Sequence, residues 1–248
     1  MDENNNTYMQ HKLLTSLILH ILPGAITAGG FFLLRPVLNR FGFPPLLAFL
    51  LAVLLLDLPV MLGIMLLAGK RAQGRLTLKD VVGFQDRLPL GKFLLYFGGA
   101  FLLVYLLISL VTPLNTLISE RLFSWLPAWI FLDDQAQYLA YGKGILIFTF
   151  SLQLILTGIV LPWVEELYFR GFLLPRLDHL GWWSPLFGGL FFAFYHVWQP
   201  YGFLTIFVLG VSLGYLVYWQ KDLRLPISLH MLANLAARIG FLMAALSM

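Results

Sequence analysis

The stretch ILIFTFSLQLILTGIVLPWVEELYFRGFLL, residues 145–174, is thirty residues long and contains three charged side chains. A helix needs roughly 20 mostly apolar residues to cross the hydrocarbon core of a bilayer, so this stretch predicts a membrane-spanning helix. The sequence contains six further stretches of this kind, at 13–34, 46–68, 93–112, 185–199, 202–219 and 226–246. The sequence therefore predicts an all-α polytopic membrane protein with about seven transmembrane helices.

The composition of the whole chain indicates the same class of protein. Of the 248 residues, 60% are hydrophobic and 11% are charged, whereas a soluble domain carries about 25% charged residues. The mean hydropathy is +0.84. These values exclude a soluble enzyme, a disordered tail and a nucleic-acid-binding protein. The net charge of +4 is instead interpreted as loop charge beside anionic membrane lipid. The absence of cysteine excludes disulfides, thiolate zinc sites and a cysteine nucleophile.

The connections divide the chain into three parts. Residues 1–12 form a polar N-terminal tail, 13–144 the N-terminal transmembrane helices with a basic loop, and 145–248 a C-terminal transmembrane core. The connection 113–144 repeats apolar residues at helical spacing, which predicts one amphipathic helix lying in the membrane interface. The residues that carry this pattern are Leu114, Leu117, Ile118, Leu122, Trp125 and Leu126.

The basic residues predict the orientation of the chain. With seven spans, one side of the membrane collects 11 Lys and Arg residues and the other collects 4, while Arg238 inside the last span completes the 16. The connection 69–92 alone supplies six of the 11. Because cytoplasmic loops carry the excess of Lys and Arg, we expect the N-terminus to lie in the cytoplasm.

Ionisable side chains inside the fourth span need a specific explanation, because an unpaired charge inside a membrane is costly. Glu166 and Arg170 are four residues apart, so they share a helical face and can form an ion pair. Glu165 points about 100° away around the helix. It therefore remains available for chemistry.

Two later spans carry further polar groups at four-residue spacing. Phe192 and His196 share a face of the fifth span, and His230 and Asn234 share a face of the seventh. At a rise of 1.5 Å per residue, the polar groups of the three spans lie roughly 6–16 Å from the cytoplasmic ends of their helices. We therefore expect them to share one cavity that opens toward the cytoplasm.

Asp57 lies in the middle of the second span, where an unpaired charge is again costly. It can line the cavity, pair with Arg238 or be protonated. The sequence leaves these three roles open.

This set of side chains suits hydrolysis of a peptide bond without a metal or another cofactor. Burial disfavours the charged form of a carboxylate, so a buried glutamate can take a proton from an attacking water. A nearby histidine can orient that water or protonate the leaving amine. A neutral imidazole and an asparagine amide can donate hydrogen bonds to the developing oxyanion.

Three motifs, in this order, resemble the signature of the CPBP family. This family comprises intramembrane glutamic endopeptidases and includes the type II CAAX prenyl proteases and the bacterial Abi proteins. The resemblance covers about residues 145–240. The motifs are Glu165-Glu166-x-x-x-Arg170, Phe192-x-x-x-His196 and His230-x-x-x-Asn234.

The resemblance implies a role for each motif. Glu165 would be the base that activates water, supported by Glu166 and Arg170, and His196 would help to position that water. His230 and Asn234 would together form the oxyanion hole.

The resemblance also implies a class of substrate and a location. We expect Phe192 to contact the substrate, a membrane-associated or lipidated peptide of the CAAX type or a bacteriocin or signal peptide undergoing processing. The short chain and compact loops indicate a bacterial cell membrane. The oligomeric state stays open.

Three alternative interpretations share these residues. A zinc metalloprotease is one, because Glu and neutral His are zinc ligands, although the helical His-Glu-x-x-His arrangement is absent. A proton-coupled transporter is another, because Glu and His chains relay protons in membranes. The third is a non-catalytic membrane scaffold or bacteriocin self-immunity factor with the same fold.

Overall fold

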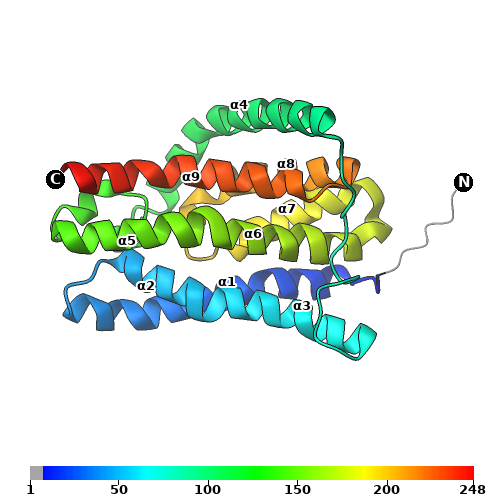
Figure 1. Cartoon of the computed structure of the whole chain (residues 1–248). Helices are drawn as coiled ribbons and strands as arrows, with labels where there is room; N and C mark the ends of the chain where they lie inside the picture. Colours follow the sequence, from blue (N-terminus) through cyan, green and yellow to red (C-terminus); the bar gives the residue numbers. More distant parts are fainter. Residues whose placement is uncertain (1–7) are drawn as a thin grey trace, which may run out of the picture.

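The computed structural model describes residues 8–248 and is built from helices (Figure 1). Within these residues the only strand-like pairing is an isolated bridge between Gln85 and Asp222, so the all-α prediction is confirmed. Six continuous helical stretches are long and apolar enough to cross a membrane. The chain is an integral membrane protein.

The helices follow one another with short connections. The α-helices are α1 (Leu13–Arg40), α2 (Pro45–Ala52), α3 (Leu58–Gln73), α4 (Leu90–Leu122), α5 (Lys143–Ile155), α6 (Leu161–Glu165), α7 (Ser184–Tyr195), α8 (Phe203–Gln220) and α9 (Arg224–Ser247). The π-helical segments are η1 (Val53–Asp57), η4 (Leu156–Val160) and η5 (Glu166–Leu173). The 3₁₀ segments are η2 (Ala128–Ile130), η3 (Gln135–Tyr138), η6 (Leu174–Trp183) and η7 (Pro200–Gly202).

The six stretches are roughly consistent with the seven predicted spans. The stretch Lys143–Tyr195 holds the predicted fourth and fifth spans, because the chain turns back near Gly181 (Figure 1). The φ of Gly181 is 56°, in a region that glycine adopts without a steric penalty. α7 is only about 18 Å long at 1.5 Å per residue, so it is too short to cross the core on its own.

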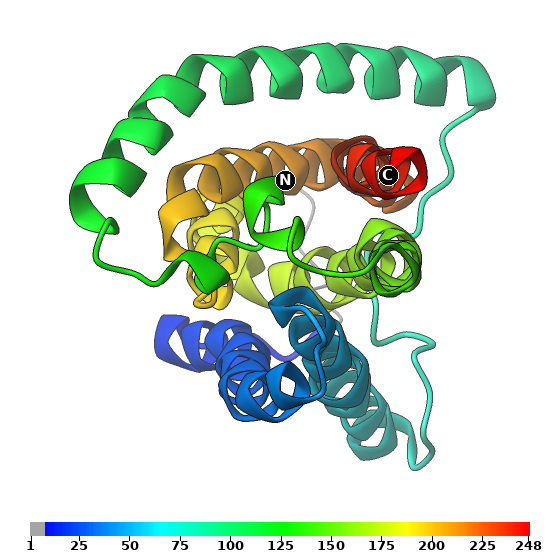
Figure 2. The ribbon, with the colours of Figure 1, turned by 90° about the vertical axis from the view of Figure 1, so that its left-hand side faces the viewer.

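Figure 2 shows the bundle end-on, with α1, α2 and α3 on one side, α4 on the opposite side and the other helices between them. α7 packs against α8 and α1, and α5 packs against α9. α7 and α8 approach each other closely. A Cβ atom on Gly189 would lie 2.5 Å from the backbone nitrogen of Val211. Glycine therefore permits the backbone contact that places α7 beside α8.

α4 is a lipid-exposed helix, none of whose residues is buried. It runs obliquely across the outside of α8 and α9 and bends before its C-terminal end (Figure 2). The sequence predicts a separate interfacial helix within 113–144, and the structure corrects this prediction. Its first part continues α4 through Pro113 to Leu122, and short 3₁₀ segments follow. The apolar spacing predicts helix, but it does not predict where that helix begins.

The three π-helical segments have a common origin in proline. η1, η4 and η5 each end two residues before a proline, namely Pro59, Pro162 and Pro175 respectively. A proline lacks the backbone N–H and its ring clashes with the carbonyl four residues earlier, and a wider turn accommodates both defects. Such bulges are frequent at functional sites. Here they contain or adjoin the polar residues of the membrane spans.

The N-terminal tail is partly visible. Residues 1–7 of the predicted tail 1–12 lie outside the described residues. The next residues contact the C-terminal core, because Gln10 Nε2 donates to the Pro175 carbonyl at 3.2 Å and the His11 amide donates to the Arg176 carbonyl at 2.8 Å.

Candidate active site

Glu166 and Arg170 form the centre of a buried ion-pair network. Arg170 Nη1 lies 3.0 Å from Glu166 Oε1, and both side chains are excluded from solvent, as their four-residue spacing predicts. Arg170 Nη2 donates to the Gly210 carbonyl at 3.1 Å. The guanidinium also lies 4.2 Å from the centroid of the Phe192 ring. Arg170 therefore joins η5 to both α7 and α8.

His230 lies between the two glutamates. Its Nδ1 is 2.8 Å from Glu166 Oε1, and its Nε2 is 3.7 Å from Glu165 Oε2. The hydrogen-bond network assigns the Nδ1 proton, which is donated to the Glu166 carboxylate. In the neutral ring Nε2 is then an acceptor, so His230 can donate to an oxyanion from Nε2 only when it is doubly protonated.

Glu165 differs from its neighbour in facing a cavity instead of the Arg170 guanidinium. It is buried, at 2% exposure, and its Oε1 has no hydrogen-bond partner within the described chain. Glu165 lines a cavity that Glu166 and Arg170 do not reach. Of the two adjacent glutamates, the structure therefore presents Glu165 to whatever enters the cavity.

His196 is held in one tautomer by the end of α7. Its Nδ1 lies 2.9 Å from the Phe192 carbonyl oxygen, which can only accept, so Nδ1 carries the proton. Nε2 is then left as an acceptor. His196 and Phe192 both line the cavity, and the two rings meet edge to face with centroids 4.7 Å apart. His196 can therefore accept a hydrogen bond from a water in the cavity.

Asn234 supplies a donor on the opposite wall. Its Nδ2 donates to the Thr157 carbonyl at 2.9 Å, and Thr157 belongs to the π-helical segment η4. An amide nitrogen has two hydrogens, so one remains for a ligand. The bulge caused by Pro162 therefore helps to anchor the amide.

The cavity has a volume of about 110 Å³, which is room for several waters at roughly 10–15 Å³ each. Its walls come from α2, the α5–η4–α6 helix, α7, α8 and α9, with the segments 131–134 and 196–199. The lining residues are Leu46, Phe49, Leu132, Asp133, Gln153, Thr157, Leu161, Glu165, Phe192, His196, Trp198, Gln199, Ile206, Leu209, His230, Asn234 and Arg238.

The structure brings together all seven residues of the three motifs around or beside this cavity. The cavity extends toward the end of the bundle where Leu132 and Asp133 lie, away from the basic connection 69–92. The depth of each residue along its helix predicts the level of the site. It does not predict which end the loops cover.

Asp57 has a different partner from the one considered in the sequence. It is fully buried, and the Tyr195 hydroxyl donates to its Oδ2 at 2.5 Å. Arg238 instead pairs with Asp133 at the cavity. The pairing of Asp57 with Arg238 is therefore wrong, and Asp57 is absent from the cavity lining. Tyr195 also interacts with the Glu165 carboxylate.

Two polar residues near the site were missed in the sequence. Tyr195 lies in an aromatic run, where a hydroxyl next to His196 gives little signal. Gln153 is 2% exposed and lines the cavity, and its Oε1 has no partner in the described chain. A glutamine in an apolar span four residues before Thr157 was the signal that could have found it.

Among residues 8–248, no three His, Cys, Asp or Glu side chains are grouped so that they could hold a metal ion. The fold and the cavity thus define a polytopic membrane protein with a buried site of carboxylates, imidazoles and an amide.

The comparison with protein families identifies the C-terminal part of the chain more closely. Residues 147–236 match the family described as type II CAAX prenyl endopeptidase Rce1-like. This segment contains all three motifs, and the match confirms the family resemblance. It implies a hydrolase of the protease class that acts on a peptide or lipidated substrate in the membrane. No curated protein and no solved structure matches the chain.

Proposed function

We propose that this protein is an intramembrane endopeptidase of the glutamic type, in which Glu165 activates the water that cleaves a peptide bond. One observation carries the proposal: the Glu165 carboxylate has a free oxygen in a buried cavity that also holds His196 and Asn234. A buried carboxylate without a cation partner is suited to accept a proton. Glu166, by contrast, is already paired with Arg170.

In the first step, Glu165 removes a proton from a water while the water oxygen bonds to the carbonyl carbon of the substrate. His196 Nε2 accepts the other hydrogen of that water and orients it. The second Nδ2 hydrogen of Asn234 binds the oxyanion, a contact typically worth about 10²–10³ in rate.

In the second step, the carbon–nitrogen bond breaks and the leaving nitrogen takes the proton held by Glu165. The products are a carboxylic acid and an amine, so the water is fully consumed. Glu166 and Arg170 position the helix that carries Glu165, and His230 links the two glutamates. When doubly protonated, His230 adds a second hydrogen bond to the oxyanion.

The substrate that fits this site is an extended segment of a membrane-associated or lipidated peptide in the bacterial cell membrane. Phe192 forms an apolar wall beside the reacting groups. The Gln153 amide, with its unpartnered Oε1, can accept a hydrogen bond from the peptide backbone.

The decisive experiment compares the parent with Glu165→Gln, which preserves size and removes the base. In membrane peptidomes from cells carrying each form, we expect peptides that appear only with the parent. With purified protein and such a peptide in detergent, Glu165→Gln should lose at least about 10⁴-fold in rate, which corresponds to about 5.5 kcal/mol.

Two controls separate this mechanism from the alternatives. If a chelator abolishes the activity and zinc restores it, the glutamic mechanism is wrong. If a cellular phenotype persists in Glu165→Gln, that phenotype belongs to a scaffold or immunity role instead of proteolysis.

A further inference from the structure

The two ends of the bundle are closed in different ways. At one end, the segment 74–89, which we call the strap, crosses the helix ends. Backbone hydrogen bonds hold it there. The Gly83 amide donates to the Gly171 carbonyl at 2.7 Å, and the Leu223 amide donates to the Phe84 carbonyl at 2.9 Å. The strap therefore joins the end of η5 to the start of α9.

Side chains complete this seal. Val81 and Val82 of the strap are buried, and a Cβ on Gly171 would lie 2.5 Å from Val82 Cγ1. Arg176 is also buried and donates to the carbonyls of Val81 and Phe172. No cavity-lining residue comes from the strap or from η6. A peptide therefore has no route to Glu165 through this end.

The cavity reaches the opposite end. Its lining residues outside the long helices are Leu132, Asp133, His196, Trp198 and Gln199. Asp133 is half exposed and pairs with Arg238. Arg238 lies one turn beyond Asn234 on α9 and its Nε has no hydrogen-bond partner in the described part of the chain. The path from the surface to Glu165 thus passes the Asp133–Arg238 pair. We call this end of the cavity, which Gln199 also lines, the mouth.

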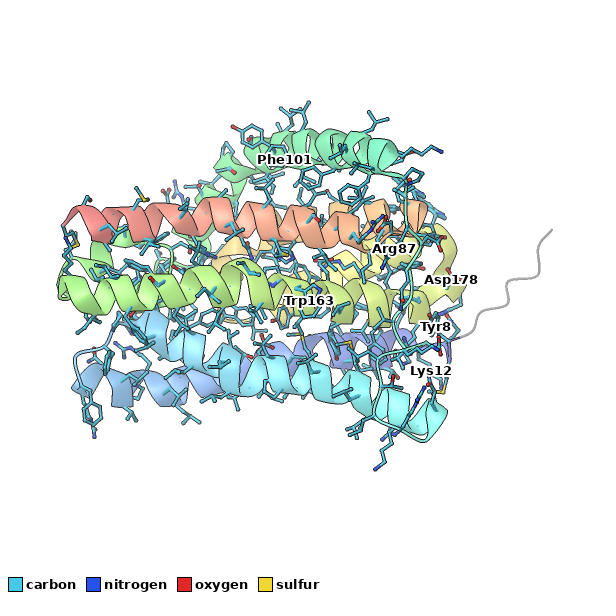
Figure 3. The ribbon with its side chains drawn as sticks, in the orientation of Figure 1. Tyr8, Lys12, Arg87, Phe101, Trp163 and Asp178 are labelled. Atoms are coloured by element: carbon cyan, nitrogen blue, oxygen red, sulfur yellow. The ribbon has the colours of Figure 1, made fainter. Side chains whose placement is uncertain are left out.

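The charges assign a side of the membrane to each end. The strap end carries ten Lys and Arg residues, whereas the mouth end carries four; Arg170 and Arg238 belong to the site and its mouth. Figure 3 shows Lys12 and Arg87 together at the strap end. Short loops rich in Lys and Arg stay in the cytoplasm. The strap end is therefore the cytoplasmic end.

We propose that the active-site cavity opens on the extracytoplasmic side, and that its substrates are peptides presenting the scissile segment on that side after export. This inference rests on the proposed peptidase function and specifies the substrate class. A translocation step must then precede cleavage, because the sealed cytoplasmic end excludes a peptide tail that remains in the cytoplasm. The unpartnered polar atoms of Gln153 and Arg238 suit an extended backbone entering from the mouth.

The absence of cysteine permits a direct test by single-cysteine labelling. Gln199→Cys probes the mouth, Arg75→Cys probes the exposed strap, and Gln135→Cys is an exposed control at the mouth end outside the cavity. Right-side-out membrane vesicles are treated with a membrane-impermeant maleimide before and after detergent. We expect Gln199→Cys and Gln135→Cys to react in intact vesicles and Arg75→Cys to react only after detergent.

The opposite pattern would overturn the proposal. Reaction of Arg75→Cys in intact vesicles, with Gln135→Cys protected, places the mouth in the cytoplasm. Protection of Gln199→Cys while Gln135→Cys reacts shows that the cavity is closed at this end. If Gln199→Cys does not accumulate, Gln135→Cys and Arg75→Cys still determine the orientation.

A second measurement connects the mouth to the substrate path. A bulky maleimide on Gln199→Cys should remove most of the activity that this variant shows unlabelled, whereas the same label on Gln135→Cys should not. Equal activity after both labels rejects the mouth as the entry route. The labelling pattern needs no activity, so its failure is distinguishable from failure of the glutamic mechanism, which Glu165→Gln tests.

Discussion

The two sides of the helix that carries Glu165 and Glu166 give adjacent glutamates opposite environments. On the packed side, Glu166 Oε1 contacts both Arg170 and His230. On the cavity side, Glu165 Oε1 has no partner in the described residues, and its Oε2 lies 3.7 Å from His230 Nε2. The same residue type is thus part of the packing on one side and available for chemistry on the other.

The number of close partners therefore distinguishes the buried acids of this protein. Asp222 accepts hydrogen bonds from the backbone amide of Leu88 and from Arg224. Asp57 Oδ2 accepts a hydrogen bond from the Tyr195 hydroxyl, and its Oδ1 has no hydrogen-bond partner among residues 8–248. A buried acid that is paired with a cation or with several donors stabilises the fold, whereas one with an unpartnered oxygen that faces a cavity can serve a reaction.

Among the substitutions that test this comparison, Glu166→Gln has the largest expected effect on stability. The neutral amide leaves the Arg170 guanidinium buried without a counter-charge, and breaking a buried pair typically costs about 3–5 kcal/mol. For a chain of this size, we expect a fall in Tm of about 10 °C or more. Thermal unfolding of purified protein in detergent measures it.

Glu165→Gln is the matched control, because it changes the adjacent residue in the same way. Its Tm should stay within a few degrees of the parent, since its carboxylate has no cation partner. Adding Arg170→Met to Glu166→Gln should restore part of the lost stability by removing the unpaired charge. Equal losses of stability in the two glutamine variants contradict the comparison.

Tyr195→Phe tests Asp57, whose carboxylate accepts a hydrogen bond from the Tyr195 hydroxyl. Removing the hydroxyl leaves the buried Asp57 carboxyl without its hydrogen-bond donor, and an unsatisfied buried group costs about 1–3 kcal/mol. Chemical or thermal unfolding in detergent should show this loss. In a double-mutant cycle with Asp57→Asn, the two losses should be non-additive, because the residues contact each other. Additive losses reject Tyr195 as the partner that stabilises Asp57.

The sequence predicted the membrane helices and the convergence of three motifs because both depend on local periodicity. Hydrophobic length predicts spans, and four-residue spacing places Glu166 beside Arg170. The partner of Asp57 was not predictable, because Tyr195 is 138 residues away along the chain. The end of the bundle toward which the cavity extends was also not predictable, since it depends on how the strap 74–89 folds across one end.

Asp222→Asn gives the smallest expected effect on stability. It tests Asp222, the buried acid that accepts hydrogen bonds from several donors. Burial alone would raise the pKa of Asp222. Hydrogen bonds from Arg224 and the backbone amides of Leu88 and Arg224 outweigh it and hold the pKa below its usual value. Because the folded pKa is lowered, the carboxylate stabilises the protein above its unfolded pKa, and this contribution disappears as the pH falls through the folded pKa.

The parent should therefore lose stability below about pH 4, near the usual aspartate pKa. Asp222→Asn should lack that step. At neutral pH the variant should be less stable by about 1 kcal/mol, a modest value because Arg224 is partly exposed. Melting curves at several pH values measure both effects.

Asp86→Asn, an exposed acid of the same strap, is the control and should shift stability by less than about 0.5 kcal/mol. An equal loss of stability below about pH 4 in Asp222→Asn and in the parent would show that the hydrogen-bond partners of Asp222 do not stabilise the fold. The contrast between Glu165 and Glu166 would then need another cause.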